Sequence, residues 1–495
     1  MASFDPGAEP GKEGVCLTTI FFWALVAYLI VLVLVGLRGS GGVATQEDFS
    51  VAGRKLSTFV LFGTMLATWI GTGSIFGNAE KTYQIGIAAL ILPLGALAGI
   101  WVLSRLAGRA RGLQQITVQD LLEKRYNAAA RLFGVLALGI AYTTIVSYQY
   151  RAAGAVLQLT LPDLSTQAAV VICAAFIILY TAMAGMVSLA RIGVIQGVTM
   201  IVGISVTLPM FFYRAGGLEG MRTALGESHM QLFGPIGWVE ALGLVLPPAL
   251  LVLGDANMYQ RFFSARTEGI ARQAVLWTLG GVAFMEFAII ATAWAAGALE
   301  PDLEIPGRVI AFAARDHLPV AMGILLLTTI MAVVLSTAAS YLLAPATSLV
   351  RDIYQRFLHP SASERFLVLL LRLTVIGLGL IALWLSTLSD EFLSVALLAY
   401  TVYGASITPA LLSAFFWRRA TGAGAVASIV VGTGVTLGWK VWGWSAVDAV
   451  LPAIAASVIT LVLVSFLTPP PPPEKVRPFF SAEPASDGSS GRGGA

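Results

Sequence analysis

The chain has 495 residues, of which 57% are hydrophobic and only 12% are charged, and its formal net charge is +3. This composition excludes a soluble globular protein, in which about 25% of residues are charged, and is typical of a protein with many membrane-spanning helices. The small net charge gives no reason to expect a nucleic-acid partner, and two cysteines and three scattered histidines indicate neither a disulfide framework nor a zinc site.

Thirteen apolar runs are long enough to cross a hydrocarbon core, which takes roughly 20 residues per helix. In chain order they cover residues 17–37, 57–78, 84–106, 130–159, 166–184, 192–213, 235–257, 271–299, 319–349, 366–387, 390–416, 423–442 and 446–467. The sequence therefore predicts an all-α polytopic membrane protein.

Lysine and arginine are distributed unevenly between the two sides of the predicted bundle. The loops after the odd-numbered runs, together with the C-terminal end, hold 22 of these residues, and the opposite side holds 7. Because basic loops stay in the cytoplasm, residues 1–16 are expected outside and the C-terminus inside a plasma (inner) membrane. Residues 468–495 are rich in Pro, Ser and Gly, which predicts a disordered cytoplasmic tail.

The second apolar run contains glycines and hydroxyl side chains that interrupt its apolar character. Residues 61–78 read LFGTMLATWIGTGSIFGN, with four glycines among hydroxyl side chains. An unwound turn is tolerated within a membrane only where it is buried in protein or lines a cavity, and there its freed carbonyls can hold a cation. We therefore interpret this run as a broken helix that forms a binding site.

A second interruption lies five runs later. The seventh run carries Pro247 and Pro248, and it is loosened again at Gly254. Paired broken helices five spans apart are the pattern of an inverted repeat, in which the two breaks meet at a binding site near the membrane midplane.

Six stretches together resemble the sodium:solute symporter family, which includes sodium-coupled carriers of sugars, proline, pantothenate, monocarboxylates and sialic acid. They are DFSVAGRKLS (48–57), ATWIGTGSIFGNA (67–79), VQDLLEKRYN (118–127), GVIQG (193–197), NMYQRFFSAR (257–266) and VVLSTAASYLLAPATSLVRDIY (333–354).

The resemblance implies a LeuT-type fold for a transporter domain at residues 17–467. In that fold a leading helix (17–37) precedes two inverted five-helix repeats, here about 57–213 and 235–416, and two further helices follow at about 423–467.

The resemblance also implies a sodium site. Its ligands would be the carbonyls of Ala67, Ile70 and Val333 and the hydroxyls of Ser336 and Thr337. The spacing puts each set on one helix face, and five neutral oxygens suit a hard monovalent cation, whereas calcium sites recruit carboxylates. The alternative is that the two hydroxyls bond back to carbonyls one turn earlier.

The number of sodium ions is a separate question. Some family members place an aspartate just before the V-I-Q of the sixth run, and that carboxylate is associated with a second sodium or with charge compensation. This chain has Gly193 there, in RIGVIQG. We therefore expect one sodium per solute.

Three residues just past the first break, Trp69, Thr72 and Ser74, match family positions that face the solute. Trp69 replaces a small polar residue found in several members, which suggests a pocket that is stacked or limited in shape. The alternative for Trp69 is packing between helices.

Among the lysines and arginines, Arg151 alone is expected inside a span, and an ionisable residue there by default marks a pathway or a paired site. It extends a polar face made by Thr144, Ser147 and Tyr148, and a guanidinium can grip a carboxylate through two parallel hydrogen bonds. We therefore predict that Ser147 and Arg151 bind the solute. The alternative is that Arg151 snorkels or pairs with an acid such as Glu80.

At the inner end of the seventh run, Asp255 and Asn257 form a polar cluster with Tyr259 and Arg261, where the family has its cytoplasmic gate. Asp255 lies nearest the hydrocarbon and is the better gate candidate; solvation in a loop is the alternative, above all for Tyr259 and Arg261. Glu286, in the middle of the eighth run, has no partner that the sequence identifies.

Together these features predict a secondary active symporter that imports a small organic solute with sodium by alternating access, the solute being a carboxylate or an amino acid. The expected partners are sodium, the solute and the lipid bilayer, with no obligatory protein partner, no cofactor besides the coupling ion and no enzymatic activity. A proton-coupled carrier of the same fold, or a channel or transporter-like sensor, remains as an alternative.

Overall fold

The computed structural model describes residues 12–40, 45–233, 236–389, 391–443 and 447–480. These residues form helices and connecting segments, with an isolated bridge between Leu56 and Ala265. The α-helices are α1 (Lys12–Ser40), α2 (Gln46–Val51), α3 (Thr58–Trp69), α4 (Asn78–Ile85), α5 (Leu92–Gly112), α6 (Val118–Arg125), α7 (Ala128–Thr160), α8 (Thr166–Arg214), α9 (Gly217–Leu225), α10 (Trp238–Gly254), α11 (Ala256–Ser264), α12 (Glu268–Leu299), α13 (Val309–Asp316), α14 (Val320–Ser348), α15 (Glu364–Leu385), α16 (Leu393–Phe416), α17 (Gly422–Val441), α18 (Val450–Leu467) and α19 (Pro473–Phe480). Short 3₁₀ turns lie at Ala52–Arg54, Gly86–Ile91, Glu227–Met230 and Pro306–Arg308, and π-helical segments lie at Gly73–Gly77 and Leu349–Leu358.

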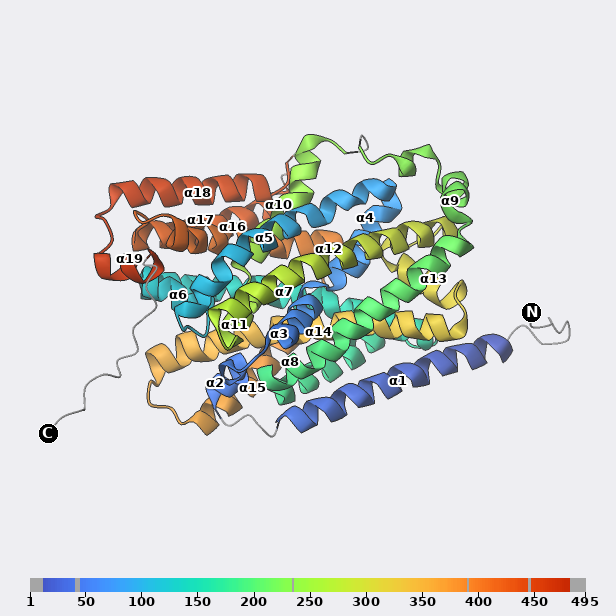
Figure 1. Ribbon diagram of the computed structural model, residues 1–495, viewed down its shortest axis with the longest axis horizontal. Helices are drawn as coiled ribbons and strands as arrows, with labels where there is room; N and C mark the ends of the chain where they lie inside the picture. The colour runs from blue at the N-terminus through green and yellow to red at the C-terminus, as the bar shows by residue number, and fades with distance from the viewer. Residues whose placement is uncertain (1–11, 41–44, 234–235, 390, 444–446, 481–495) are drawn as a thin grey trace.

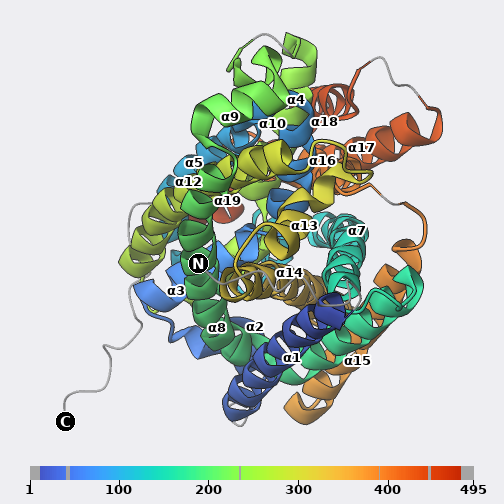
Figure 2. The same ribbon diagram turned by 90° about the vertical axis from the view of Figure 1, so that its right-hand side faces the viewer.

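The long helices run roughly along one axis, with α1 at one edge of the bundle and α18 at the other (Figure 1). Seen along that axis, α14 lies inside the bundle, where it contacts α7 and α8 (Figure 2). The broken helix that begins with α3 packs against α8, α12 and α14. The centre of the bundle is therefore where α3 and α14 meet.

Twelve helices in the described part of the chain are long and apolar enough to cross a membrane. One of them, Gly73–Gly112, contains both the second half of the broken helix and the next span, while Thr58–Trp69 is a shorter apolar helix. Within α8, Gly185 adopts φ 61°, ψ 176° and separates two of the twelve spans. The fold class is as predicted, and the count of thirteen spans stays a prediction.

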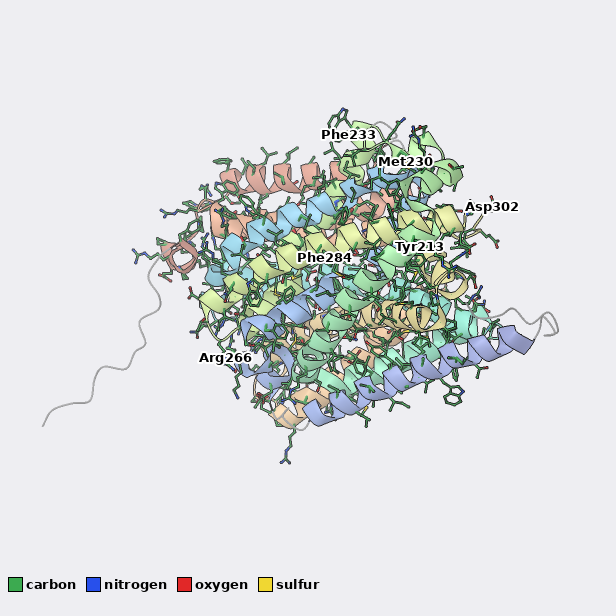
Figure 3. All side chains as sticks on the ribbon, turned by 45° about the vertical axis from the view of Figure 1, so that its right-hand side comes forward. Tyr213, Met230, Phe233, Arg266, Phe284 and Asp302 are labelled. Atoms are coloured by element: carbon green, nitrogen blue, oxygen red, sulfur yellow. The ribbon has the colours of Figure 1, made fainter. Side chains whose placement is uncertain are left out.

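The flanks of the bundle carry apolar side chains. Phe284 of α12 projects from one flank and is 48% exposed, whereas Arg266 and Asp302 lie toward opposite ends (Figure 3). This arrangement of an apolar flank between polar ends is what a lipid-facing surface requires.

The expected disorder of the tail is wrong for Pro473–Phe480. These residues form α19, in which Phe479 is buried and its ring packs edge-on against Phe415. Arg109 donates to the carbonyl of Phe479 at 2.6 Å. The free energy gained by burying the ring of Phe479 outweighs the tendency toward disorder that the composition of the tail predicts. Residues 481–495 of the predicted tail, and residues 1–11 of the predicted outer N-terminus, lie outside the described residues.

Gly95 allows α5 and α10 to approach closely, since a Cβ there would lie 1.9 Å from the carbonyl oxygen of Val245. We expect Gly95→Ala to lower the free energy of unfolding by about 1–3 kcal/mol, the usual cost of overpacking, measured as a lower melting temperature in detergent. Gly139→Ala on α7 is the matched control, because a Cβ there meets nothing within 4 Å. Equal melting temperatures for the two variants would contradict the packing.

Candidate functional site

The helix that begins as α3 breaks within the membrane-spanning bundle. After Trp69, Ile70 adopts an extended conformation (φ −68°, ψ 104°), and the chain becomes helical again through the π-helical turn Gly73–Gly77. A Cβ on Gly71 would lie 3.0 Å from the side chain of Thr337, and one on Gly73 would lie 2.6 Å from the hydroxyl of Tyr400. The glycines are therefore needed where α14 and α16 approach the break.

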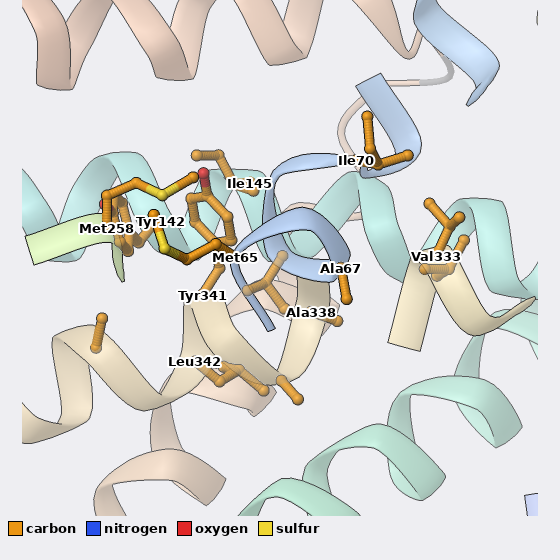
Figure 4. Close-up of a cluster of buried hydrophobic side chains, with 14 of the residues drawn as sticks. Met65, Ala67, Ile70, Tyr142, Ile145, Met258, Val333, Ala338, Tyr341 and Leu342 are labelled. Carbon is orange, nitrogen blue, oxygen red and sulfur yellow. The ribbon is translucent and has the colours of Figure 1, made fainter. Parts of the chain in front are cut away.

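The five oxygens predicted to bind sodium come together at this break. Ser336 Oγ lies 2.5 Å from the carbonyl oxygen of Ala67 and 2.9 Å from that of Val333. Thr337 Oγ1 lies 3.2 Å from the carbonyl oxygen of Ile70. Figure 4 shows Ala67 and Ile70 on the broken helix and Val333 on α14.

The donor set consists of neutral oxygens only. The contact between Ser336 and Val333 is the back-bond expected of any membrane-helix hydroxyl, but Thr337 reaches across to the break instead of back along α14. The described residues contain no group of three or more His, Cys, Asp or Glu side chains that could hold a metal ion. The cluster at the break therefore has the chemistry of a site for a hard monovalent cation.

A cavity of about 50 Å³ adjoins this cluster, and Thr337 belongs to both. Trp69 and Ser74 line the cavity from the broken helix, and Tyr148 and Gln149 line it from α7. Of the three residues predicted to face the solute, Trp69 and Ser74 line the cavity. Thr72 is buried, and both its hydroxyl and its backbone N–H donate to Gln149 Oε1.

Glu286 also lines the cavity, and the sequence did not identify its partners. Ser74 Oγ donates to Glu286 Oε1 and Asn78 Nδ2 donates to Glu286 Oε2, both at 2.7 Å. The residue is 3% exposed. A signal was present, since an ionisable residue in a membrane span is functional by default.

The structure does not bring Ser147 and Arg151 to the cavity. Ser147 Oγ donates to the carbonyl of Thr144 at 2.7 Å, and Arg151 Nη1 donates to the carbonyl of Ser386, at the end of α15, at 2.8 Å. Successive residues of a helix point about 100° apart, so Arg151, two residues after Gln149, points to nearly the opposite side of α7 from Gln149, where it contacts the end of α15.

The second interruption lies at Gly254–Asp255, where α10 ends and α11 begins. The prediction that Pro247 and Pro248 interrupt this span is wrong, since both lie inside α10. Pro248 and Leu251 of α10 line the same cavity as Trp69. Both broken helices therefore line the same cavity.

Asp255 is not in a solvated loop but is 1% exposed. Its carboxylate accepts from the backbone N–H groups of Asn257 and Met258 at 2.6 and 3.1 Å, which caps α11. The hydroxyls of Tyr341 and Tyr142 also donate to it, at 2.9 and 3.1 Å. Asp255 thus joins α11 to α7 and α14.

Solvation in a loop, the alternative for Arg261, does not hold, because the residue is 1% exposed. It donates to the carbonyl of Asn257, which is itself fully buried, at 3.0 Å and to Ser340 Oγ at 2.9 Å, and it also donates to Thr68 Oγ1. Because Thr68 follows Ala67 and Ser340 lies one turn beyond Thr337, Arg261 links α11 to both helices of the oxygen cluster.

Known proteins are similar to this chain in sequence over most of its length. The sequence model of the sodium:solute symporter family matches residues 49–432. The chain is 25% identical to the sodium/proline symporter of Haemophilus influenzae, covering 92% of this chain and 96% of that protein. It is 24% identical to the high-affinity proline transporter PutP of Bacillus subtilis, covering 89% and 96%.

Two solved structures resemble the fold. A Na⁺-coupled sialic acid symporter in a substrate-bound outward-open state matches with a TM-score of 0.78 at 18% identity, covering 91% of this chain and 98% of that one. Mhp1, a nucleobase-cation-symport-1 family transporter in a closed conformation, matches with a TM-score of 0.59 at 12% identity, covering 87% and 97%.

The contacts of Asp255 predict a difference between two substitutions. We expect Asp255→Ala to lower the free energy of unfolding by about 2 kcal/mol or more, because it removes a helix cap and leaves two buried tyrosine hydroxyls without an acceptor. Asp255→Asn keeps a side-chain oxygen for the cap and should lose less. Thermal unfolding in detergent compares the two, and equal losses would contradict the capping role.

Proposed function

Since the chain belongs to the sodium:solute symporter family, we propose that it imports a small amino acid together with one sodium ion by alternating access. It is a sodium-coupled symporter of a small organic solute with a LeuT-type fold. The relatives are transporters, and we propose neither an enzymatic activity nor a cofactor besides the coupling ion.

The observation that carries the sodium assignment is the oxygen cluster between α3 and α14. Ser336 and Thr337 lie within 3.3 Å of carbonyls of the broken helix, so a cation held there would tie the two helices together. Thr337 also lines the solute cavity. An ion that stabilises the arrangement in which the solute binds raises the affinity for the solute, and the solute raises the affinity for the ion by the same factor.

Binding of the solute requires the lining helices to move. Ligand pockets usually enclose about 300–1,000 Å³, and the cavity has about 50 Å³. Rocking of the broken helices against α14 would widen it, and we assign Asp255 and Asn257 to the cytoplasmic gate, since Asp255 connects α11 with α7 and α14. Moving one positive charge inward releases about 2.3 kcal/mol per 100 mV.

One close contact and one buried charge favour the binding of one sodium ion per solute. A Cβ on Gly193 would lie 3.0 Å from the Cα of Thr64, so any side chain at position 193 would require α3 to move by a few tenths of an ångström. The buried guanidinium of Arg261 also lies against Thr68 and Ser340, and its charge disfavours a second cation beside them.

The proposed solute class rests on the relatives, several of which are named as proline symporters or transporters. Arg151 no longer supports a carboxylate, because it contacts α15 and does not line the cavity. The excess of basic residues on one side favours a plasma (inner) membrane location with the N-terminus outside and the C-terminus in the cytoplasm.

Uptake into proteoliposomes tests the coupling ion. With labelled L-proline as the first solute tried, an inward sodium gradient is expected to drive accumulation, and a proton gradient of equal size without sodium is not. Protein-free liposomes are the control. Equal uptake under the two gradients would favour the proton-coupled alternative, for which Glu286 in the cavity is a titratable group.

The oxygen cluster predicts the effect of two substitutions. Ser336→Ala and Thr337→Ala should each raise the sodium concentration for half-maximal transport, because each removes one ligand oxygen. Folding should survive, since a lost interhelical hydrogen bond costs only about 0.6–2 kcal/mol in a bilayer.

Thr329→Ala is the matched control. Its hydroxyl lies on the same helix, bonds back to the carbonyl of Leu325 at 2.8 Å, and is eight residues, or about 12 Å, from Thr337. Sodium dependence that is unchanged in both site variants, or changed equally in the control, would place the ion elsewhere.

A further inference from the structure

We infer that Glu286 selects the solute by pairing with its positively charged nitrogen, so that this symporter takes small zwitterionic amino acids. The inference rests on the proposed function, which it extends from a class of transporter to a contact between one side chain and one group of the solute. It follows from the shape and the chemistry of the cavity beside the break in α3.

Glu286 is the only acidic or basic residue among the described residues that line this cavity. It lies in the middle of α12, and the residue is 3% exposed. An uncompensated charge buried at this depth is costly. A carboxylate retained at the centre of a solute cavity is therefore expected to receive a positive charge from the solute.

The partners of Glu286 within the protein do not supply that charge. Ser74 and Asn78 are neutral, and each donates one hydrogen bond to a different carboxylate oxygen at 2.7 Å. No ion pair joins Glu286 to a basic residue in the part of the chain that the structure describes. Each carboxylate oxygen can accept about two hydrogen bonds, so both oxygens keep capacity for a donor on the solute.

Aromatic and aliphatic side chains make up most of the remaining wall. Trp69, Tyr148, Tyr341 and Tyr400 line the cavity. The face of an aromatic ring attracts a cation and also packs against saturated carbon. This wall suits a small cationic nitrogen carried on an aliphatic skeleton better than it suits a sugar, which needs many hydrogen-bonding partners.

Gln149 offers a donor in the same cavity. Its Oε1 accepts from the N–H of Thr72 at 3.4 Å, which orients the amide, and its Nε2 is buried without a hydrogen-bond partner among the described residues. A buried donor without an acceptor costs about 1–3 kcal/mol. A solute carboxylate would satisfy it, so an acceptor at Glu286 and a donor at Gln149 together match the two ends of a zwitterion.

The first test compares solutes on the unaltered protein. In sodium buffer, a thermal-shift screen is run with the amino acids, with nitrogen-free counterparts such as tetrahydrofuran-2-carboxylate for L-proline, and with sugars and polyols. Compounds with a cationic nitrogen should shift the melting temperature, and their nitrogen-free counterparts should not. A screen in which nitrogen-free acids or sugars shift the protein as much, or in which no compound with a cationic nitrogen does, overturns the inference.

The second test uses Glu286→Gln, which keeps the shape but removes the charge. The dissociation constant of the best amino acid should rise at least about tenfold, as expected when a hydrogen bond to a charged group is lost. Glu300→Gln, at the end of the same helix and paired with His317, is the matched control. The shift caused by sodium alone checks that the variant is folded. An unchanged dissociation constant in Glu286→Gln overturns the inference.

The outcomes separate this inference from the proposed function. If an amino acid binds through Glu286 but a proton gradient drives its uptake, the proposed sodium coupling is wrong and the proposed role of Glu286 is retained. If sodium drives uptake of an uncharged solute, the role of Glu286 fails and the sodium coupling stands.

Discussion

The rest of the structure depends on how the carbonyls freed at the end of α3 are satisfied. Within a membrane, a backbone oxygen without a partner costs several kcal/mol, and the turn at Ile70 leaves such oxygens at Ala67 and Ile70. The hydroxyls of Ser336 and Thr337 approach them, and the glycine at position 71 lets α14 come close enough. A cation at this point would replace only the few hydrogen bonds that these two side chains make to the freed carbonyls. Because few bonds are exchanged, the break suits reversible binding of an ion.

The second break is satisfied differently. At the start of α11 the unpaired groups are N–H donors, and the carboxylate of Asp255 accepts from two of them. Two tyrosine hydroxyls hold the same carboxylate, so this break needs no ion. The freed oxygens of one broken helix and the freed N–H groups of the other therefore have opposite polarity. That difference, rather than the sequence of either helix alone, suits the first break to the proposed ion site and the second to a fixed cap.

Local patterns were sufficient to predict the apolar spans, the break in residues 61–78 and the common helix face of Ser336 and Thr337, because periodicity and glycine content are properties of short segments. The second break was predicted only in part: α10 does end at Gly254, but the interruption predicted at Pro247 and Pro248 is wrong, since both are accommodated within α10. The partners of Glu286 lie 212 and 208 residues away in the chain. No pattern within a segment identifies such pairs, and the same limit explains why Arg151 was assigned to the wrong neighbours.

The buried ionisable groups near the centre of the bundle can be told apart by their contacts. Asp255 accepts from two N–H groups and two hydroxyls, and Arg261 donates to three oxygens, so both have partners that hold helices in place. Glu286 has two neutral donors and faces the cavity. Charged groups in a membrane are retained where they stabilise structure or take part in transport. Contacts within the protein explain the burial of Asp255 and Arg261 more fully than that of Glu286. The carboxylate of Glu286 can accept further hydrogen bonds, and it faces the cavity proposed for the solute.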